Sequence, residues 1–156
     1  MGNGRKAARI AVEEVRLALA EATQEQMRRQ LHTFFEMVPG EVVCVYLYGS
    51  VARGTTRPTS DIDLAVLYAV PPPSTLEGLG EALSSELEQV LARPVDLLVL
   101  NRASVDLIHR VLRDGLLVYD ADPAARIRFE VQARNAYFDL LPYLRAYRQQ
   151  ALQASA

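Results

Sequence analysis

Two short apolar runs restrict the possible folds of this chain most strongly. They read EVVCVYLYG over residues 41–49 and DIDLAVLYAV over residues 61–70. Both are rich in β-branched and aromatic residues and are too short for a typical helix, so each is predicted to form a strand. Their apolar residues follow one another without polar alternation, which indicates strands covered on both faces. The sequence therefore predicts an α/β (or α+β) fold with helices on either side of a sheet.

Two further segments complete the predicted sheet. They are VDLLVLN over residues 95–101 and LLVYD over residues 116–120, which gives a small mixed sheet of about four strands. Helical spacing of apolar residues predicts helices over residues 6–22, 23–38, 76–91, 102–115 and from 123 onward. Thr23 is expected to begin the second helix, because Gln26 stands three residues later as in a capping box. Asp122 is expected to cap the last helix, and Pro142 to kink or end it.

Length and composition limit the domain organisation and the class of protein. The 156 residues predict a single domain, 1–156, divided into an additional N-terminal helix (1–22), a core (23–120) and a C-terminal helical tail (121–156). The net charge of −2 argues against a protein that holds nucleic acid through many phosphate contacts. Cys44 is the single cysteine, which excludes an internal disulfide. With no signal peptide and no apolar run of roughly 18 residues, a cytoplasmic protein is expected.

Three aspartates stand at or near the beginning of predicted apolar strands. Asp61 and Asp63 are two positions apart, so on a strand their side chains project to the same face. Asp96 is second in the third predicted strand and faces the same cleft if that strand lies beside the second. Like charges this close are unfavourable unless a cation neutralises them, and three carboxylates suit a pair of Mg²⁺ ions. These aspartates are therefore the candidate metal ligands and catalytic residues.

A Gly-Ser pair supplies a second candidate binding element. Gly49 and Ser50 follow the first predicted strand and are expected to open a short helix, where backbone N–H groups meet a phosphate. Arg53 and Arg57 are close enough in sequence to offer cationic contacts to a triphosphate. Each feature alone has an ordinary explanation as a turn, a strand end or a solvated side chain. Their combination in this order indicates a site for a nucleotide and metal ions.

The segment YLYGSVARGTTRPTSDIDLAVL, residues 46–67, resembles the nucleotidyltransferase superfamily that includes the DNA polymerase β-like enzymes. It is most similar to the minimal nucleotidyltransferases, the MNT proteins that serve as antitoxins beside HEPN-domain toxins. Gly49 and Ser50 precede Asp61 by the ten-residue gap of the MNT motif, and Asp63 completes its carboxylate pair. Asp96 falls where the third carboxylate of the family is expected. The direct resemblance covers residues 38–120.

The resemblance implies a nucleotidyltransferase fold, binding of ATP with Mg²⁺, and transfer of AMP to a hydroxyl with release of pyrophosphate. In the antitoxin group the acceptor is a tyrosine of the HEPN ribonuclease, which implies a hetero-oligomeric complex with that toxin. Gly49 and Ser50 would hold the β and γ phosphates, and Asp61 and Asp63 would bind both metal ions. Asp96 would bind one ion and take the proton from the attacking hydroxyl.

Two other functions remain open at this point. One is an antitoxin that binds and occludes its toxin without catalysis, although the carboxylates and the Gly-Ser pair are all present. The other is a nucleotidyltransferase acting on a small molecule or an RNA end, against which the acidic net charge argues.

Overall fold

The computed structural model describes residues 3–38, 41–55, 60–75 and 80–154. Its elements are, in chain order, α1 (Asn3–Met37), β1 (Val42–Tyr48), α2 (Gly49–Ala52), β2 (Ile62–Tyr68), α3 (Glu81–Leu91), β3 (Val95–Val99), the 3₁₀ turn η1 (Leu100–Arg102), α4 (Val105–Asp114), β4 (Leu116–Asp120) and α5 (Pro123–Ala154). None of the described helices is long and apolar enough to cross a membrane.

The four strands form one mixed sheet in the order β3-β2-β1-β4. β1 pairs antiparallel with both β2 and β4, whereas β2 and β3 run parallel. The predicted fold class, a small mixed sheet flanked by helices, is confirmed. The third strand is shorter than predicted, because Asn101 leaves the strand and its side chain pairs with Tyr68. Its Oδ1 accepts from Tyr68 N and its Nδ2 donates to Tyr68 O, both at 2.9 Å.

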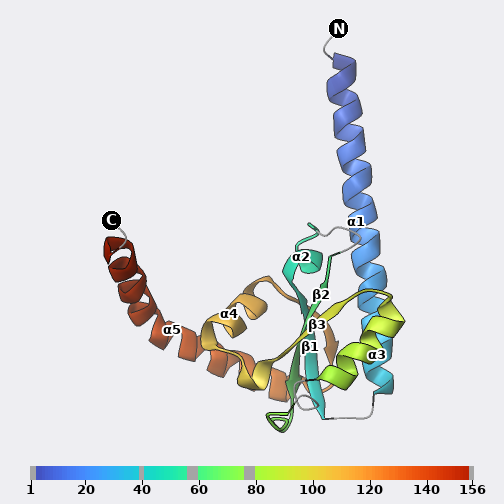
Figure 1. Cartoon of the computed structure of the whole chain (residues 1–156). Helices are drawn as coiled ribbons and strands as arrows, with labels where there is room; N and C mark the ends of the chain where they lie inside the picture. Colours follow the sequence, from blue (N-terminus) through green and yellow to red (C-terminus); the bar gives the residue numbers. More distant parts are fainter. Residues whose placement is uncertain (1–2, 39–40, 56–59, 76–79, 155–156) are drawn as a thin grey trace.

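Helices cover both faces of the sheet, as the uninterrupted apolar strands require (Figure 1). On one face, α1 and α3 enclose a core that includes Leu31, Phe35, Leu47, Leu64 and Leu87. On the other face, α4 and α5 pack over a second core that includes Cys44, Tyr46, Ala65, Leu100 and Val111. Successive strand residues therefore alternate between the two cores, and this alternation decides on which face each polar residue lies.

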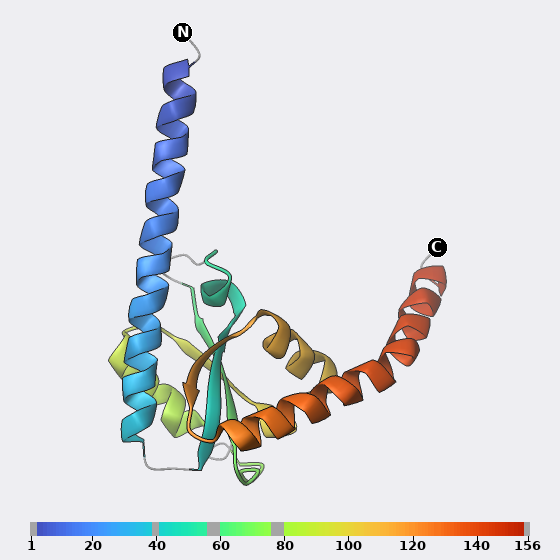
Figure 2. The ribbon, with the colours of Figure 1, turned by 180° about the vertical axis from the view of Figure 1, so that it is seen from behind.

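α1 differs from the prediction, because residues 3–37 form one helix with no break at residues 22–23. The Thr23 hydroxyl donates to the Leu19 carbonyl at 2.8 Å, so it bonds back to its own helix instead of capping a new one. No Gly or Pro interrupts residues 5–37, and an isolated capping-box spacing does not end a helix. The N-terminal part of α1 extends well beyond the sheet, as both views show (Figures 1 and 2).

α5 begins as predicted and continues further than predicted. Asp122 Oδ1 accepts from Ala125 N at 2.9 Å, so it caps the helix that starts at Pro123. The helix runs through Pro142 without ending, and its C-terminal part bends away from the sheet (Figure 2). Aromatic side chains on that part are exposed, with Tyr143 and Tyr147 each 73% accessible. The N-terminal half of α5 therefore belongs to the core, and the other half projects from it.

Candidate active site

Two of the predicted site aspartates lie side by side on neighbouring strands. In the parallel pairing of β2 with β3, Asp63 is the register partner of Asp96. In the antiparallel pairing of β1 with β2, Asp63 is the partner of Tyr48. The side chains of Asp96, Asp63 and Tyr48 thus form a row across three strands. Asp61 directly precedes β2 and is exposed.

Strand alternation places this row on the face covered by α4 and α5. Ala65, two residues after Asp63, packs in the core of that face, while Leu64 packs in the opposite core. The row lies where β2 begins and β1 ends, next to α2. The N-terminal part of α1 and the C-terminal part of α5 extend toward this same side of the molecule (Figures 1 and 2).

The electrostatics of the row are those of crowded like charges. The pKa of Asp63 is raised by burial and by the carboxylates of Asp96 and Asp61, and Arg53 opposes this shift. Burial, with Asp63 and Asp96 nearby, raises the pKa of Tyr48 to about 12, while Arg110 lowers it. Asp61, Asp63 and Asp96 therefore act on a common region at this edge of the sheet. None of the ion pairs found in the described part of the chain involves them.

Gly49 joins this carboxylate row to the Gly-Ser turn. It has a φ of +72°, a conformation that residues with a Cβ rarely adopt, and a Cβ at this position would lie 2.0 Å from Asp63 Oδ2. The backbone of the turn therefore packs directly on the Asp63 carboxylate. The turn is closed by hydrogen bonds from Arg53 N to Gly49 O at 3.2 Å and from Thr55 N to Ser50 O at 3.0 Å. Val51, only 2% exposed, anchors it in the core.

Sequence reasoning missed two residues near the row, Tyr48 and Arg110. Tyr48 immediately precedes the Gly-Ser pair, and its place beside Asp63 follows from strand register, which is a long-range feature. Arg110 comes from α4, about 50 residues after Asp61, and nothing in the local sequence around it indicates the site. Of the predicted arginines, Arg53 lies near Asp63, whereas Arg57 lies outside the described residues.

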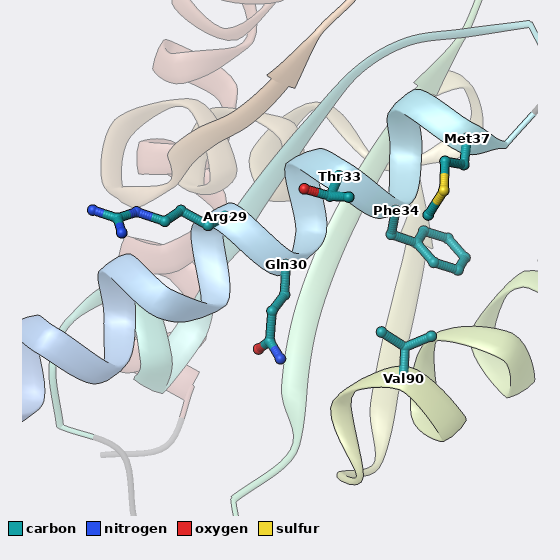
Figure 3. A pocket seen from close by; sticks show the side chains of 6 residues that line it. All are labelled: Arg29, Gln30, Thr33, Phe34, Met37 and Val90. Carbon is teal, nitrogen blue, oxygen red and sulfur yellow. The ribbon is translucent and has the colours of Figure 1, made fainter.

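A cavity of about 320 Å³ lies elsewhere, between α1 and α3 (Figure 3). Its lining residues are Arg29, Gln30, Thr33, Phe34, Met37 and Val90. Phe34 belongs to the core on the face of the sheet opposite the aspartates. The cavity is mainly apolar and contains no carboxylate, so its chemistry does not suit a triphosphate with metal ions. The carboxylate row remains the candidate active site.

Comparison with known proteins identifies the family. The model described as "Polymerase beta, Nucleotidyltransferase" matches residues 29–124. The chain belongs to this nucleotidyltransferase family. The matched segment contains the Gly-Ser turn and all three aspartates of the candidate site, and it begins within α1.

Several relatives are similar to this nucleotidyltransferase. The "Protein adenylyltransferase MntA" of Shewanella oneidensis is 39% identical over 72 residues, which is 46% of this chain and 49% of the relative. The chain thus matches about half the length of this curated relative. A crystal structure of a toxin–antitoxin with AMP-PNP is 27% identical with a TM-score of 0.62, covering 85% of this chain and 97% of the other. A tri-AMPylated Shewanella oneidensis HEPN toxin in complex with MNT antitoxin, at 24% identity and a TM-score of 0.57, shows the same fold over 87% of this chain and 98% of the other.

The donor chemistry of the nucleotidyltransferase site suits hard divalent cations, because its three aspartates offer only oxygen ligands. The pKa of Asp63, raised first by burial and then by the carboxylates of Asp96 and Asp61, is a second sign of fit, since a cation would relieve the repulsion among these carboxylates. Within the described ranges, no group of three or more His, Cys, Asp or Glu side chains is arranged so that it could hold a metal ion. A metal ion held by all three aspartates would therefore require their side chains to move.

Proposed function

We propose that this chain is a Mg²⁺-dependent protein adenylyltransferase that transfers AMP from ATP to a tyrosine of a HEPN-domain toxin and so acts as its antitoxin. The observation that carries the proposal is the row of Asp63 and Asp96, with Asp61 beside it, packed against the Gly49 turn. The similarity to the adenylyltransferase MntA and to a toxin–antitoxin structure with AMP-PNP supports the reaction and the nucleotide. The HEPN complex that shares the fold supports the class of partner.

In this proposal the two parts of the site have different tasks. Gly49 and Ser50 bind the β and γ phosphates through backbone N–H groups and the serine hydroxyl, which Gly49 permits because it lacks a side chain. Arg53 and Arg57 add positive charge toward the same phosphates. Asp61, Asp63 and Asp96 hold the Mg²⁺ ions. When bound, those ions would neutralise the negative charge of the phosphates.

The proposed reaction is an in-line displacement at the α-phosphorus of ATP. The tyrosine oxygen of the toxin forms a new P–O bond, the bond to the bridging oxygen breaks, and pyrophosphate leaves. Asp96 accepts the proton of the tyrosine hydroxyl. Catalysis of this kind depends mainly on positioning and charge stabilisation, so a small rigid sheet edge is sufficient.

The test is to incubate the purified chain with labelled ATP, Mg²⁺ and its co-encoded HEPN partner, then locate the label by mass spectrometry. We expect AMP on a tyrosine of the partner and no transfer by the Asp61→Ala/Asp63→Ala variant. Glu86→Gln is a matched control, because Glu86 is an exposed carboxylate on α3. Protection of cells by the double variant equal to that by the wild type would instead support occlusion without catalysis.

A further inference from the structure

Gln24 forms a polar link between α1 and the Gly-Ser turn. It is half-buried, and its Nε2 donates to Val51 O at 3.2 Å and to Ala52 O at 3.0 Å. These carbonyls belong to the C-terminal end of α2, whose first two residues are Gly49 and Ser50. Gln24 lies in α1, five residues before the segment 29–124 that matches the family model.

α2 is positioned partly by this contact and partly by Val51, which is buried in the core. It has four residues, and a helix of one turn is not stable in isolation. The last carbonyls of a helix also lack partners within the helix. Val51 O receives one backbone hydrogen bond, from Gly54 N at 3.1 Å. Gln24 adds a second donor to Val51 O and supplies one to Ala52 O.

The position of α2 affects the candidate site because Gly49, at the N-terminal end of α2, packs tightly against Asp63. The Asp63 carboxylate occupies the space where a side chain of Gly49 would stand, so a shift of α2 moves the turn against or away from that carboxylate. Gln24 acts on α2 from the opposite end, through the carbonyls two and three residues after Gly49. A displacement of about 1 Å in a site of this kind can reduce the rate by two orders of magnitude.

We infer that Gln24 is a positioning residue for nucleotide binding, holding the Gly49–Ser50 turn in register with Asp63 from α1. The inference rests on the proposed function, in which the turn binds the phosphates of ATP. It assigns to α1 a second task, namely supporting the phosphate-binding turn in addition to covering the sheet.

Two variants separate this task from simple packing. Gln24→Glu keeps the shape of the side chain but replaces the donor by a carboxylate facing two carbonyls. Gln24→Met keeps a similar length and removes the donor without adding charge. Gln26→Glu makes the same charge change two residues along α1 at an exposed position, and it is the matched control.

The experiment measures binding of ATP and Mg²⁺ by calorimetry, the KM for ATP in transfer to the partner, and the melting temperature. We expect Gln24→Glu to weaken ATP binding and raise KM about tenfold, Gln24→Met to do so about threefold, and Gln26→Glu to leave both within twofold. Unchanged ATP affinity in folded Gln24→Glu or Gln24→Met would overturn the inference. So would a loss of activity explained wholly by an unfolded fraction, with KM unchanged. If the wild-type chain binds no ATP, the proposed function itself fails, which is a distinct result.

Discussion

Two groups of carboxylates lie on the face of the sheet that α4 and α5 cover, and they differ in whether cationic side chains of the chain pair with them. One is the candidate active site around Asp63. The other surrounds Arg126 on α5, whose Nε donates to Asp120 at 2.9 Å and whose Nη1 donates to Glu130 at 2.8 Å. The hydroxyl of Tyr46 also donates to Glu130, at 2.6 Å. We call this second group, Asp120, Arg126, Glu130 and Tyr46, the anchor cluster.

The pKa shifts of Glu130 in the anchor cluster and of Asp63 in the candidate site differ in sign. Burial alone would raise the pKa of Glu130, but hydrogen bonds from Tyr46 and Arg126 outweigh it and the pKa is lowered. Burial also raises the pKa of Asp63, and there the neighbouring carboxylates raise it further. Carboxylates that hold α5 on the sheet are therefore neutralised within the chain. Within the described residues, the carboxylates of the candidate site form no such ion pair, which is consistent with a site for an external cation.

The largest expected effect comes from removing a site carboxylate. Asp63→Asn should reduce AMP transfer at least about 10³-fold, because it removes a predicted metal ligand. It should not lower the melting temperature, because it also removes the repulsion with Asp96 and Asp61. Parallel measurements of transfer rate and thermal unfolding, without metal, check both expectations. A clear loss of stability would show that Asp63, like Glu130, stabilises the fold. The contrast between the candidate site and the anchor cluster would then be wrong.

Gly49→Ala should have the next largest effect. Its Cβ would lie 2.0 Å from Asp63 Oδ2, so the turn or the carboxylate must move, and we expect ATP affinity or transfer to fall about 10²-fold. Gly54→Ala is the matched control, because Gly54 has a similar φ of +67° but open space around it. It should cost about 1 kcal/mol of stability and little activity. Equal losses of activity in both variants would mean that backbone strain, and not contact with Asp63, explains the glycine.

A change in the anchor cluster should give the converse result. Glu130→Gln weakens the bonds to Arg126 and Tyr46 and should lower the free energy of unfolding by about 2 kcal/mol, while the folded protein keeps its transfer activity. A fall in kcat in fully folded Glu130→Gln would instead show that the anchor cluster contributes to catalysis together with the candidate active site.

The pH dependence of this stability follows from the sign of the shift. Because the pKa of Glu130 is lower in the folded chain than its ordinary value of 4.5, its ionised form stabilises the fold above that value. The contribution is lost as pH falls below 4.5 and through the folded pKa. The groups that face Glu130 are Tyr46, Arg126 and Arg134. Chemical denaturation at neutral pH and near pH 3 should therefore show the difference between wild type and Glu130→Gln shrinking in acid.

The sequence predicted the elements of the fold better than the contacts between them. Uninterrupted apolar strands and the Asp122 cap are local signals, and the structure reproduces both. The break expected at Thr23 failed, because the hydroxyl bonds to Leu19 within a continuous helix. The row of Asp63 with Asp96 could be anticipated only by assuming that their strands are neighbours. Tyr48, Arg110 and Gln24 approach the site through strand register and helix packing, which no local pattern records.

The smallest effect is expected where opposite charges meet in solvent. Arg148 Nη2 on the projecting part of α5 lies 3.7 Å from Asp106 Oδ1 on α4, and both side chains are substantially exposed. Water screens such a pair, so Arg148→Ala should change the free energy of unfolding by less than about 1 kcal/mol, against about 2 kcal/mol for Glu130→Gln. Urea denaturation of the two variants compares them directly. A larger loss in Arg148→Ala would mean that the outer part of α5 is held to the core by this ion pair, and the division of α5 into an anchored half and a projecting half would then be wrong.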